Sequence, residues 1–229
     1  CWGNNNKYQL GLGHTNSRGS SSSHMGSNLP NLNLGSGRTA IAVATGKEHA
    51  CAVLDSGAVK CWGENGNGQL GIGSTTGSQT PAAAVDFGAD SSGTAYTAKS
   101  VSMGKNHVCA ILNIGALYCW GNGASGALGI GSTSNSTTPS NVSLGASRTA
   151  TAVALGTFFT CVIMDNGLVK CWGENDSGRL GIGSTTDSNT PAAVELGTGL
   201  KAIAIAAGNK HVCVIMDNNK VKCWGHNEY

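Results

Sequence analysis

Eight of the nine cysteines stand in pairs whose members are ten residues apart, and thiols at such a spacing can do three kinds of chemistry. They can form a disulfide, stay reduced in an apolar core, or bind a metal ion as thiolates. The pairs are Cys51 with Cys61, Cys109 with Cys119, Cys161 with Cys171, and Cys213 with Cys223. Cys1 is left over.

The segment between two paired cysteines has the pattern of a β-hairpin. Counting inward from Cys51 and Cys61 pairs Val53 with Val59 and leaves Asp55 to Gly57 as a three-residue loop. Directly opposed residues of antiparallel strands have Cα atoms roughly 4.5 to 5.5 Å apart, a distance that a disulfide can span. We therefore interpret the pairs as hairpin disulfides, with buried reduced thiols as the alternative.

A zinc site is the third possibility. His49, His107 and His211 each stand two residues before a cysteine, so a strand would place both side chains on one face. Phe159 takes the place of the histidine in the remaining copy, although the cysteines of that copy are kept. Loss of one ligand with retention of the others argues against zinc. We expect no metal and assign the histidines to packing or hydrogen bonding.

Gly66, Gly68 and Gly71 have the G-x-G-x-x-G spacing of a dinucleotide-binding turn. That turn works between a strand and a helix, and no helical pattern follows, so we expect these glycines to supply positive φ in a loop over the neighbouring repeat. Glu64 and Glu174 begin this loop, and we expect them to bind loop amides. With no catalytic motif found, the sequence predicts a protein that is not an enzyme and has no cofactor.

These residues all belong to one unit that recurs along the chain. Cys-Trp-Gly occurs five times at intervals of 52 to 60 residues, and 35 glycines among 229 residues suit short strands joined by tight turns. A period near 50 with several short apolar segments is typical of a β-propeller blade. We assign all five tryptophans structural roles: Trp2, Trp62, Trp120, Trp172 and Trp224.

Each unit divides into four predicted strands. The first alternates Ala with larger apolar residues, as at residues 41–44, and its small side chains place it innermost, where blades crowd toward the axis. The hairpin supplies the second and third strands, and a proline-led segment supplies the fourth at the outer edge. In the first, partial unit this fourth strand is predicted near Leu29 to Leu34.

The sequence thus predicts a single all-β array over residues 1–229. Its parts are a repeat remainder over residues 1–35, complete repeats over residues 36–90, 91–147 and 148–198, and a truncated repeat over residues 199–229. Because the chain starts at a third strand and stops inside a glycine loop, we expect it to be a fragment of a longer protein.

Charge excludes several partner classes. A net charge of +2 gives no electrostatic reason to expect nucleic acid or a membrane surface as a partner. Lys201, Lys210, Lys220 and Lys222 make the last segment mildly basic, and we interpret them as solvated strand edges and loops. Apolar runs fall short of the roughly 20 residues of a membrane helix, so no membrane insertion is predicted.

Two stretches interrupt the regular repeat and are our candidate binding loops. Ser17 to Ser27 lengthens the first unit and contains Ser17 and His24. Asp86 to Ala98 lengthens the second and contains Asp86, Asp90 and Tyr96.

The placed motifs resemble the regulator of chromosome condensation repeat family. The resemblance rests on Gln69-Leu70-Gly71 with Trp62-Gly63 upstream, and on Ala127-Leu128-Gly129 and Arg179-Leu180-Gly181 in later copies. It implies a seven-bladed propeller of four-stranded antiparallel blades, of which this chain would supply about four. Members of the family act in nucleotide exchange on a small GTPase with chromatin binding, in ultraviolet-B photoreception, in inhibition of beta-lactamases, and as domains of large ligases.

Paired hairpin cysteines resemble exported members of that family rather than its nuclear members. We therefore predict a non-enzymatic scaffold in an extracellular or exported compartment, binding protein or glycan through face loops. The alternatives are a guanine-nucleotide exchange factor or chromatin-associated regulator, nuclear or cytoplasmic if the cysteines are reduced, and an inhibitor of a secreted hydrolase.

Overall fold

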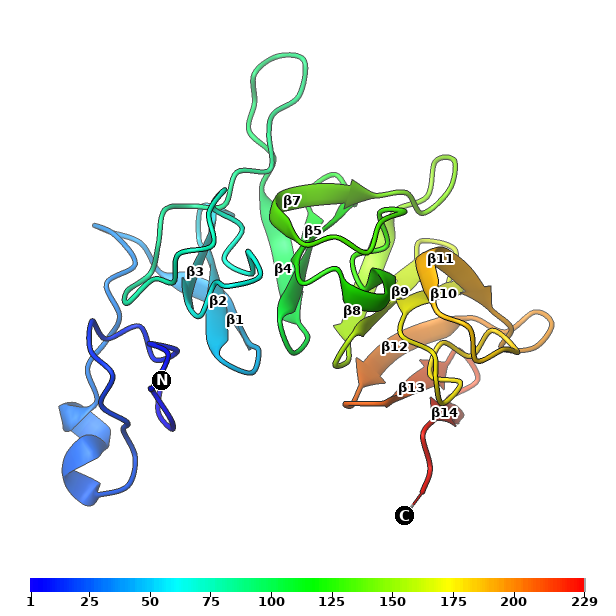
Figure 1. Ribbon diagram of the computed structural model, residues 1–229. Helices are drawn as coiled ribbons and strands as arrows, with labels where there is room; N and C mark the ends of the chain where they lie inside the picture. Colours follow the sequence, from blue (N-terminus) through cyan, green and yellow to red (C-terminus); the bar gives the residue numbers. More distant parts are fainter. Residues whose placement is uncertain (229) are drawn as a thin grey trace.

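The structure, a computed structural model that describes residues 1–228, is an arc of antiparallel sheets (Figure 1). Within that range there are four sheets, two with four strands and two with three. The first contains β1 (Ala40–Thr45), β2 (His49–Leu54) and β3 (Val59–Gly63). The second contains β4 (Ala98–Met103), β5 (His107–Leu112), β6 (Leu117–Gly121) and β7 (Ser136–Val142). The third contains β8 (Ala150–Leu155), β9 (Phe159–Met164), β10 (Val169–Gly173) and β11 (Ser188–Val194). The fourth contains β12 (Ala202–Ala207), β13 (His211–Met216) and β14 (Val221–Gly225).

The remaining regular elements are three short 3₁₀ turns: η1 (Ser22–His24), η2 (Gly26–Asn28) and η3 (Ala124–Gly126). None of the helices within residues 1–228 has the length and apolar character needed to cross a bilayer. The all-β propeller architecture predicted from the sequence is confirmed, and the four sheets follow one another as blades. Residue 229, the last of the predicted truncated repeat, lies outside the described residues.

The innermost position predicted for the first strand is also confirmed. Adjacent sheets meet through β1, β4, β8 and β12, and the hydroxyl of Ser102 donates to the carbonyl of Val153 across one such junction at 3.1 Å. Ala42 and Ala44 pack against the core between the first and second sheets. A β-bulge follows the first residue of each of these strands, and it leaves Ile41 and Ile203 about three-fifths exposed.

The hairpin register predicted from the cysteines is the register observed. Val53 lies opposite Val59, and Cys51 lies opposite Cys61. The same opposition of cysteines recurs in the other three sheets. The turn joins the next blade, because the carbonyl of Gly57 accepts from the amide of Ala98 at 2.8 Å. Each hairpin therefore fixes both its own blade and the start of its neighbour.

The outer edge is less regular than predicted. In the first sheet the fourth segment pairs only by the isolated bridges Lys60 with Ala84 and Gly63 with Ser78. The predicted strand near Leu29 to Leu34 is wrong, since residues 29–34 form no strand. In complete blades the equivalent segment pairs with the third strand, as Val142 pairs with Leu117, and residues 29–34 have no such partner strand within residues 1–228. Leu32 and Leu34 still pack against the cluster that contains Trp62.

The core lies between blades, and we predict that its tryptophans dominate its stability. Trp120 is fully buried, whereas Trp2 is 66% exposed. Trp120→Ala should lower the free energy of unfolding by about 3 to 5 kcal/mol, because it opens a large cavity in a packed core. Urea unfolding followed by fluorescence of the other tryptophans measures this loss. Trp2→Ala is the matched control and should change it by less than about 0.5 kcal/mol; equal effects of the two variants would contradict the assignment of Trp120 to the core.

Candidate functional site

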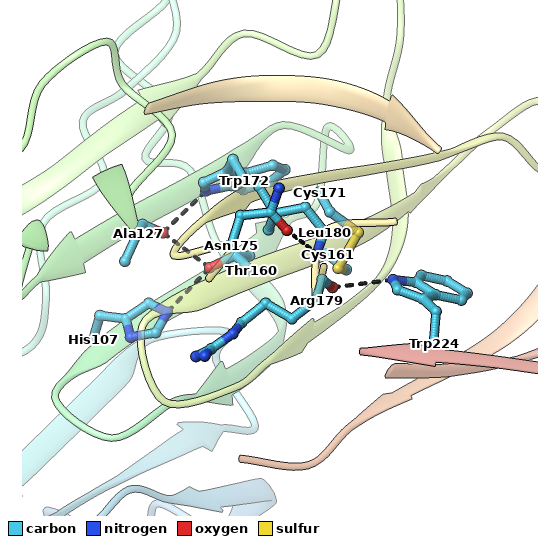
Figure 2. Close-up of a disulfide and its surroundings, with 10 residues drawn as sticks. All are labelled: His107, Ala127, Thr160, Cys161, Cys171, Trp172, Asn175, Arg179, Leu180 and Trp224. Carbon is cyan, nitrogen blue, oxygen red and sulfur yellow. Dashed lines mark hydrogen bonds between the residues drawn. A yellow bond between two sulfur atoms is a disulfide. The ribbon is translucent and has the colours of Figure 1, made fainter. Parts of the chain in front are cut away.

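The repeated tryptophan joins each blade to the one before it. The indole Nε1 of Trp172 donates to the carbonyl of Ala127 at 3.0 Å, and that of Trp224 donates to the carbonyl of Arg179 at 3.0 Å (Figure 2). The same bond joins Trp62 to Gln9 and Trp120 to Gln69. The acceptor always belongs to the Leu-Gly loop of the preceding unit, so the motif is a joint rather than a site.

Glycine is required at that joint. Gly71 has φ +70°, and a Cβ there would lie 2.7 Å from Nε1 of Trp120. Gly129 and Gly181 face Trp172 and Trp224 in the same way. The expectation that the glycines of the G-x-G-x-x-G spacing form a positive-φ loop over the neighbouring repeat is confirmed for Gly68 and Gly71, and the spacing has a structural explanation.

Trp2 departs from this arrangement and is exposed. The loop that covers each of the other indoles comes from the preceding unit, and Trp2 belongs to the first unit of the sequence. The assignment of a structural role to all five tryptophans therefore describes four of them in this structure. Trp224 is half-buried, and the other three are fully buried.

The cysteines form four cross-strand disulfides. Their Cα atoms lie 4.0 to 4.1 Å apart, and the sulfur atoms are bonded in all four hairpins. Three of the pairs are completely buried beside the tryptophans of the same strands. The fourth, Cys213 with Cys223, is more exposed, and Cys1 is free and exposed. Within residues 1–228 no cluster of three His, Cys, Asp or Glu side chains could hold a metal ion.

Buried asparagines form a second repeated set of hydrogen bonds, which sequence reasoning did not predict. Asn65 donates through Nδ2 to the carbonyls of Ser74 and Thr76 at 2.9 Å each, and its Oδ1 accepts from the amide of Leu70 at 2.9 Å. Asn5 and Asn175 make the equivalent bonds. Their recurrence two residues after Cys-Trp-Gly is the signal that could have found them. They hold the glycine loop in shape.

The two repeated glutamates behave differently from each other. Glu64 accepts from the amide of Gly66 at 3.1 Å, as expected. Glu174 instead pairs with the fully buried guanidinium of Arg179, which also pairs with Asp176. Glu64 also lies 3.3 Å from the ammonium of Lys7. Both glutamates are therefore engaged in contacts of the glycine loop.

His49 and His107 lie buried beneath the first-strand turns. A Cβ on Gly46 or Gly104 would lie 2.3 Å from the corresponding imidazole ring, so glycine makes room for each histidine. Nε2 of His107 lies 3.0 Å from the hydroxyl of Thr160, which donates to the same Ala127 carbonyl that accepts from Trp172 (Figure 2). Val108 occupies the equivalent of Thr160 in the next blade toward the N-terminus. Neither ring nitrogen of His49 finds a hydrogen-bond partner within residues 1–228.

Burial keeps both imidazoles neutral. Desolvation, with a smaller contribution from the nearby His107, lowers the pKa of His49 from 6.5 to about 3. Desolvation lowers the pKa of His107 to about 4. These histidines are packing and hydrogen-bonding groups of the core, and water does not reach them.

The candidate binding loops occupy separate places. Ser17 and His24 lie in the segment around η1 and η2, at the N-terminal end of the arc (Figure 1). Asp86, Asp90 and Tyr96 belong to residues 86–97, here called the arm, which projects beyond the sheets between β3 and β4 (Figure 1). The two predicted loops therefore do not form one site.

The arm is a small, self-supporting hairpin. The amide of Tyr96 donates to the carbonyl of Gly88 at 2.9 Å, and that of Asp90 donates to the carbonyl of Thr94 at 3.0 Å. The carboxylate of Asp90 accepts from the hydroxyl and amide of Ser92 and from the amide of Thr94, and these bonds lower its pKa. At the base, the buried ring of Phe87 lies edge-on to Trp120 with 5.8 Å between centroids. The arm is thus anchored in the core.

A second exposed feature is a hollow of about 600 Å³ where the turns between first and second strands converge. These turns, here called the axial loops, are residues 46–48, 104–106, 156–158 and 208–210. Lys47, Lys105 and Lys210 line the hollow, which we call the axial hollow. The sequence predicts Lys210 to be a solvated loop residue, because nothing in a linear sequence shows that turns 58 and 52 residues apart meet at one point.

Comparison with known proteins agrees with this geometry. Two profiles of the "Regulator of chromosome condensation (RCC1) repeat" match four times each along the chain. The first covers residues 1–53, 56–111, 115–163 and 166–215, and the second covers residues 40–69, 98–127, 150–179 and 202–229. The chain belongs to the RCC1 repeat family. The resemblance stated from the sequence motifs is thereby confirmed.

Relatives of this RCC1-repeat chain include the ultraviolet-B receptor UVR8 of Arabidopsis thaliana, 30% identical over 82% of this chain and 41% of the receptor. The human E3 ubiquitin-protein ligase HERC2 is 27% identical over 84% of this chain and 4% of the ligase. Among solved structures, human WBSCR16 superposes with a TM-score of 0.78 over 99% of this chain and 56% of its own, at 22% identity. Yeast RCC1 (Prp20), solved bound to Kap60, gives 0.70 over 85% and 45%, at 20% identity. The chain spans less than three-fifths of the length of each of these relatives.

The buried histidines make the RCC1 array sensitive to acid. Unfolding exposes His49, which then binds a proton near pH 6.5, whereas the folded chain resists protonation until about pH 3. Stability is therefore full above pH 6.5, and for this group it falls by up to about 1.4 kcal/mol for each pH unit below. His49→Phe copies Phe159 of the third blade and removes this dependence.

We predict that the advantage of His49→Phe over the wild type in free energy of unfolding grows as the pH is lowered from 6 to 4, by about 1.4 kcal/mol per unit. Urea titrations at several pH values measure it. His24→Phe, in the surface segment at η1, is the control and should show no such growth. A constant difference between His49→Phe and wild type at all pH values would contradict the burial of neutral His49.

Proposed function

We propose that this RCC1-repeat array is a non-enzymatic protein-interaction scaffold that acts in an exported, oxidising compartment. One observation carries the proposal: the repeated Trp, Cys, Asn and His side chains make contacts within and between the blades and not with a ligand site. The tryptophans join blades, the cysteines are bonded in pairs, the asparagines hold loops, and His49 and His107 are buried. What faces solvent and varies between blades is a set of loops, and loops on a rigid frame are typical binding elements.

The arm supports this function because it is ordered before any partner binds. Its backbone bonds and the anchoring of Phe87 fix its direction, so a partner would not have to offset the entropy of ordering a mobile loop. It carries two carboxylates, Asp86 and Asp90, and no basic side chain. Yeast RCC1, which shares the fold, is recorded in complex with the protein Kap60, and this favours a protein as the partner here.

The disulfides support an oxidising compartment, because cross-links of this kind persist where thiols are not continuously reduced. We predict that, in protein isolated from its source with acid quenching and then alkylated without reductant, the eight paired cysteines stay unmodified. Mass spectrometry after digestion reads each cysteine separately. Alkylation of all nine cysteines would contradict the exported location and favour an intracellular regulator.

Each disulfide should also contribute to stability. The double variant Cys109→Ala with Cys119→Ala should lose about 3 kcal/mol of free energy of unfolding, the cost expected for opening a short cross-linked loop. Calorimetry of this variant beside Cys1→Ala, which removes only the free thiol, measures the difference. Equal midpoints for the two would show that the cross-link does not stabilise the folded chain.

The scaffold function is tested by shortening the arm. Residues 88–96 can be exchanged for the Gly-Ala-Ser-Arg of residues 145–148, which makes the same connection between the second and third blades. Phe87 and Thr97 are kept, so the core contact of the base stays. We expect the wild type to capture defined proteins from the extracellular fluid of the source organism, and the exchange variant to lose them at least about tenfold, as when a contact patch is removed.

Quantitative mass spectrometry of both captures makes the comparison, and the melting midpoint of the exchange variant shows that the frame is intact. As a control, Ser21 to Ser23 on the other irregular segment are replaced by Gly. If wild type and exchange variant capture the same proteins in the same amounts, the arm is not a contact surface of this scaffold.

A further inference from the structure

We propose that the axial hollow binds an acidic peptide segment of a partner protein. The inference deepens the proposed scaffold function and rests on it. Charge is the first argument. Lys47, Lys105 and Lys210 come from three different blades and converge on one hollow of about 600 Å³. Within the described part of the chain, no carboxylate lines that hollow, so the three cations face a common space without a counter-charge inside it.

The acidic side chains nearby lie at the periphery. Glu48 is 3.7 Å from the ammonium of Lys47, and both side chains are partly exposed, a geometry that gives only a weak, readily exchanged pair. Asp176 is near enough to Lys210 to sense its charge, but it is already paired with Arg179. Lys105 meets a ring rather than a carboxylate: its ammonium lies 5.0 Å from the centroid of Phe158. A carboxylate entering the hollow would be the first anion to face all three lysines.

The axial loops hold this arrangement rigid. The amide of Lys47 donates to the carbonyl of Lys105 at 3.2 Å, and that of Thr157 donates to the carbonyl of Asn209 at 3.1 Å. Glycines allow the close approach, because a Cβ on Gly104 would lie 2.4 Å from the carbonyl oxygen of Gly156. Neighbouring loops are thus bonded to each other, and the lysines start from fixed backbone positions, which reduces the entropy lost on binding.

The lining of the hollow favours a peptide over a nucleic acid. Met103, Leu155 and Ala207, the last residues of three first strands, also line it, and they belong to the apolar clusters between the blades. Within residues 1–228 no aromatic ring lines the hollow, and such rings are the usual platforms for single-stranded bases. Three lysines around a hollow without a lining carboxylate or aromatic ring match a segment in which several Asp or Glu side chains are separated by small residues.

The repeat does not require Lys47, Lys105 and Lys210 for its structure. The residue after the turn glycine is Lys in two blades, Thr157 in the third and Asn209 in the fourth. The position of Lys210 is held by Glu48, Asn106 and Phe158 in the other blades, so the frame does not require a cation at either position. By contrast, Lys170 donates to the main-chain carbonyl of Leu144, and Lys222 donates to that of Leu196. These carbonyls lie in the connections that lead into the third and fourth sheets. Replacing the lysines of the hollow should therefore change binding without changing the fold.

The test uses a fluorescein-labelled peptide of alternating Glu and Ala, followed by fluorescence anisotropy on the complete chain. We expect the wild type to bind it, and binding to weaken as ionic strength rises from about 20 mM to about 150 mM. The triple variant Lys47→Gln, Lys105→Gln and Lys210→Gln should bind at least about tenfold more weakly. The control triple variant Lys99→Gln, Lys201→Gln and Lys220→Gln makes the same change in net charge on exposed residues outside the hollow, and should bind within about twofold of the wild type.

Four results would overturn the proposal. Equal weakening by both triple variants would mean that only net charge matters. No binding of the Glu-Ala peptide, or equal binding of its Gln-Ala counterpart, would mean that the hollow does not recognise carboxylates. Tighter binding of an oligothymidylate, lost in the first triple variant alone, would assign the hollow to nucleic acid.

This test is separable from that of the scaffold. Capture that depends on the arm, together with an unaffected peptide affinity in the hollow variant, would leave the scaffold function standing and end the present inference. Peptide binding that requires the three lysines, together with capture independent of the arm, would keep the hollow as a contact surface of the scaffold and exclude the arm.

Discussion

The burial of one indole per blade beneath the Leu-Gly turn of the preceding blade is the interaction on which the structure depends. It combines the burial of a large apolar surface with one hydrogen bond from Nε1 to a loop carbonyl, as for Trp120 and Gln69. The bond is specific because the acceptor is presented by a loop that Asn65 and the positive φ of Gly71 hold in shape. Blade order along the chain thereby becomes blade order in space.

The other repeated groups support this joint. The disulfide next to each tryptophan ties the two strands that carry it, and the hairpin turn beyond is bonded to the first strand of the following blade. His107 extends the same network, through Thr160 and the carbonyl that receives Trp172. Two blades differ from this arrangement. Phe159 places an apolar ring where other blades have a histidine. His49 keeps the imidazole, but it lacks a hydrogen-bond partner of the kind that Thr160 provides for His107.

The repeated side chains are engaged in holding the blades together, so we assign function to the parts of the chain that depart from the repeat or arise between blades. The arm and the axial hollow are the two exposed features that the repeat does not dictate, and they differ in charge: the arm carries Asp86 and Asp90, and the hollow carries three lysines. They also differ in origin. The arm is an insertion between two blades, and the hollow arises only because separate turns meet around an axis. A partner that contacts both would need surfaces of opposite sign.

The sequence by itself determined the blade, because its determinants are local: the ten-residue spacing of Cys109 and Cys119 fixes a hairpin register, and the recurrence of Cys-Trp-Gly fixes the period. It also placed the arm as an insertion. It predicted a strand at residues 29–34 that does not form, since a strand needs a partner that pattern alone does not supply. Only the tertiary structure decided that Lys47, Lys105 and Lys210 share one hollow. The physical reason is that the convergence of side chains depends on residues from other blades. The sequence of one repeat does not specify the angle between neighbouring blades.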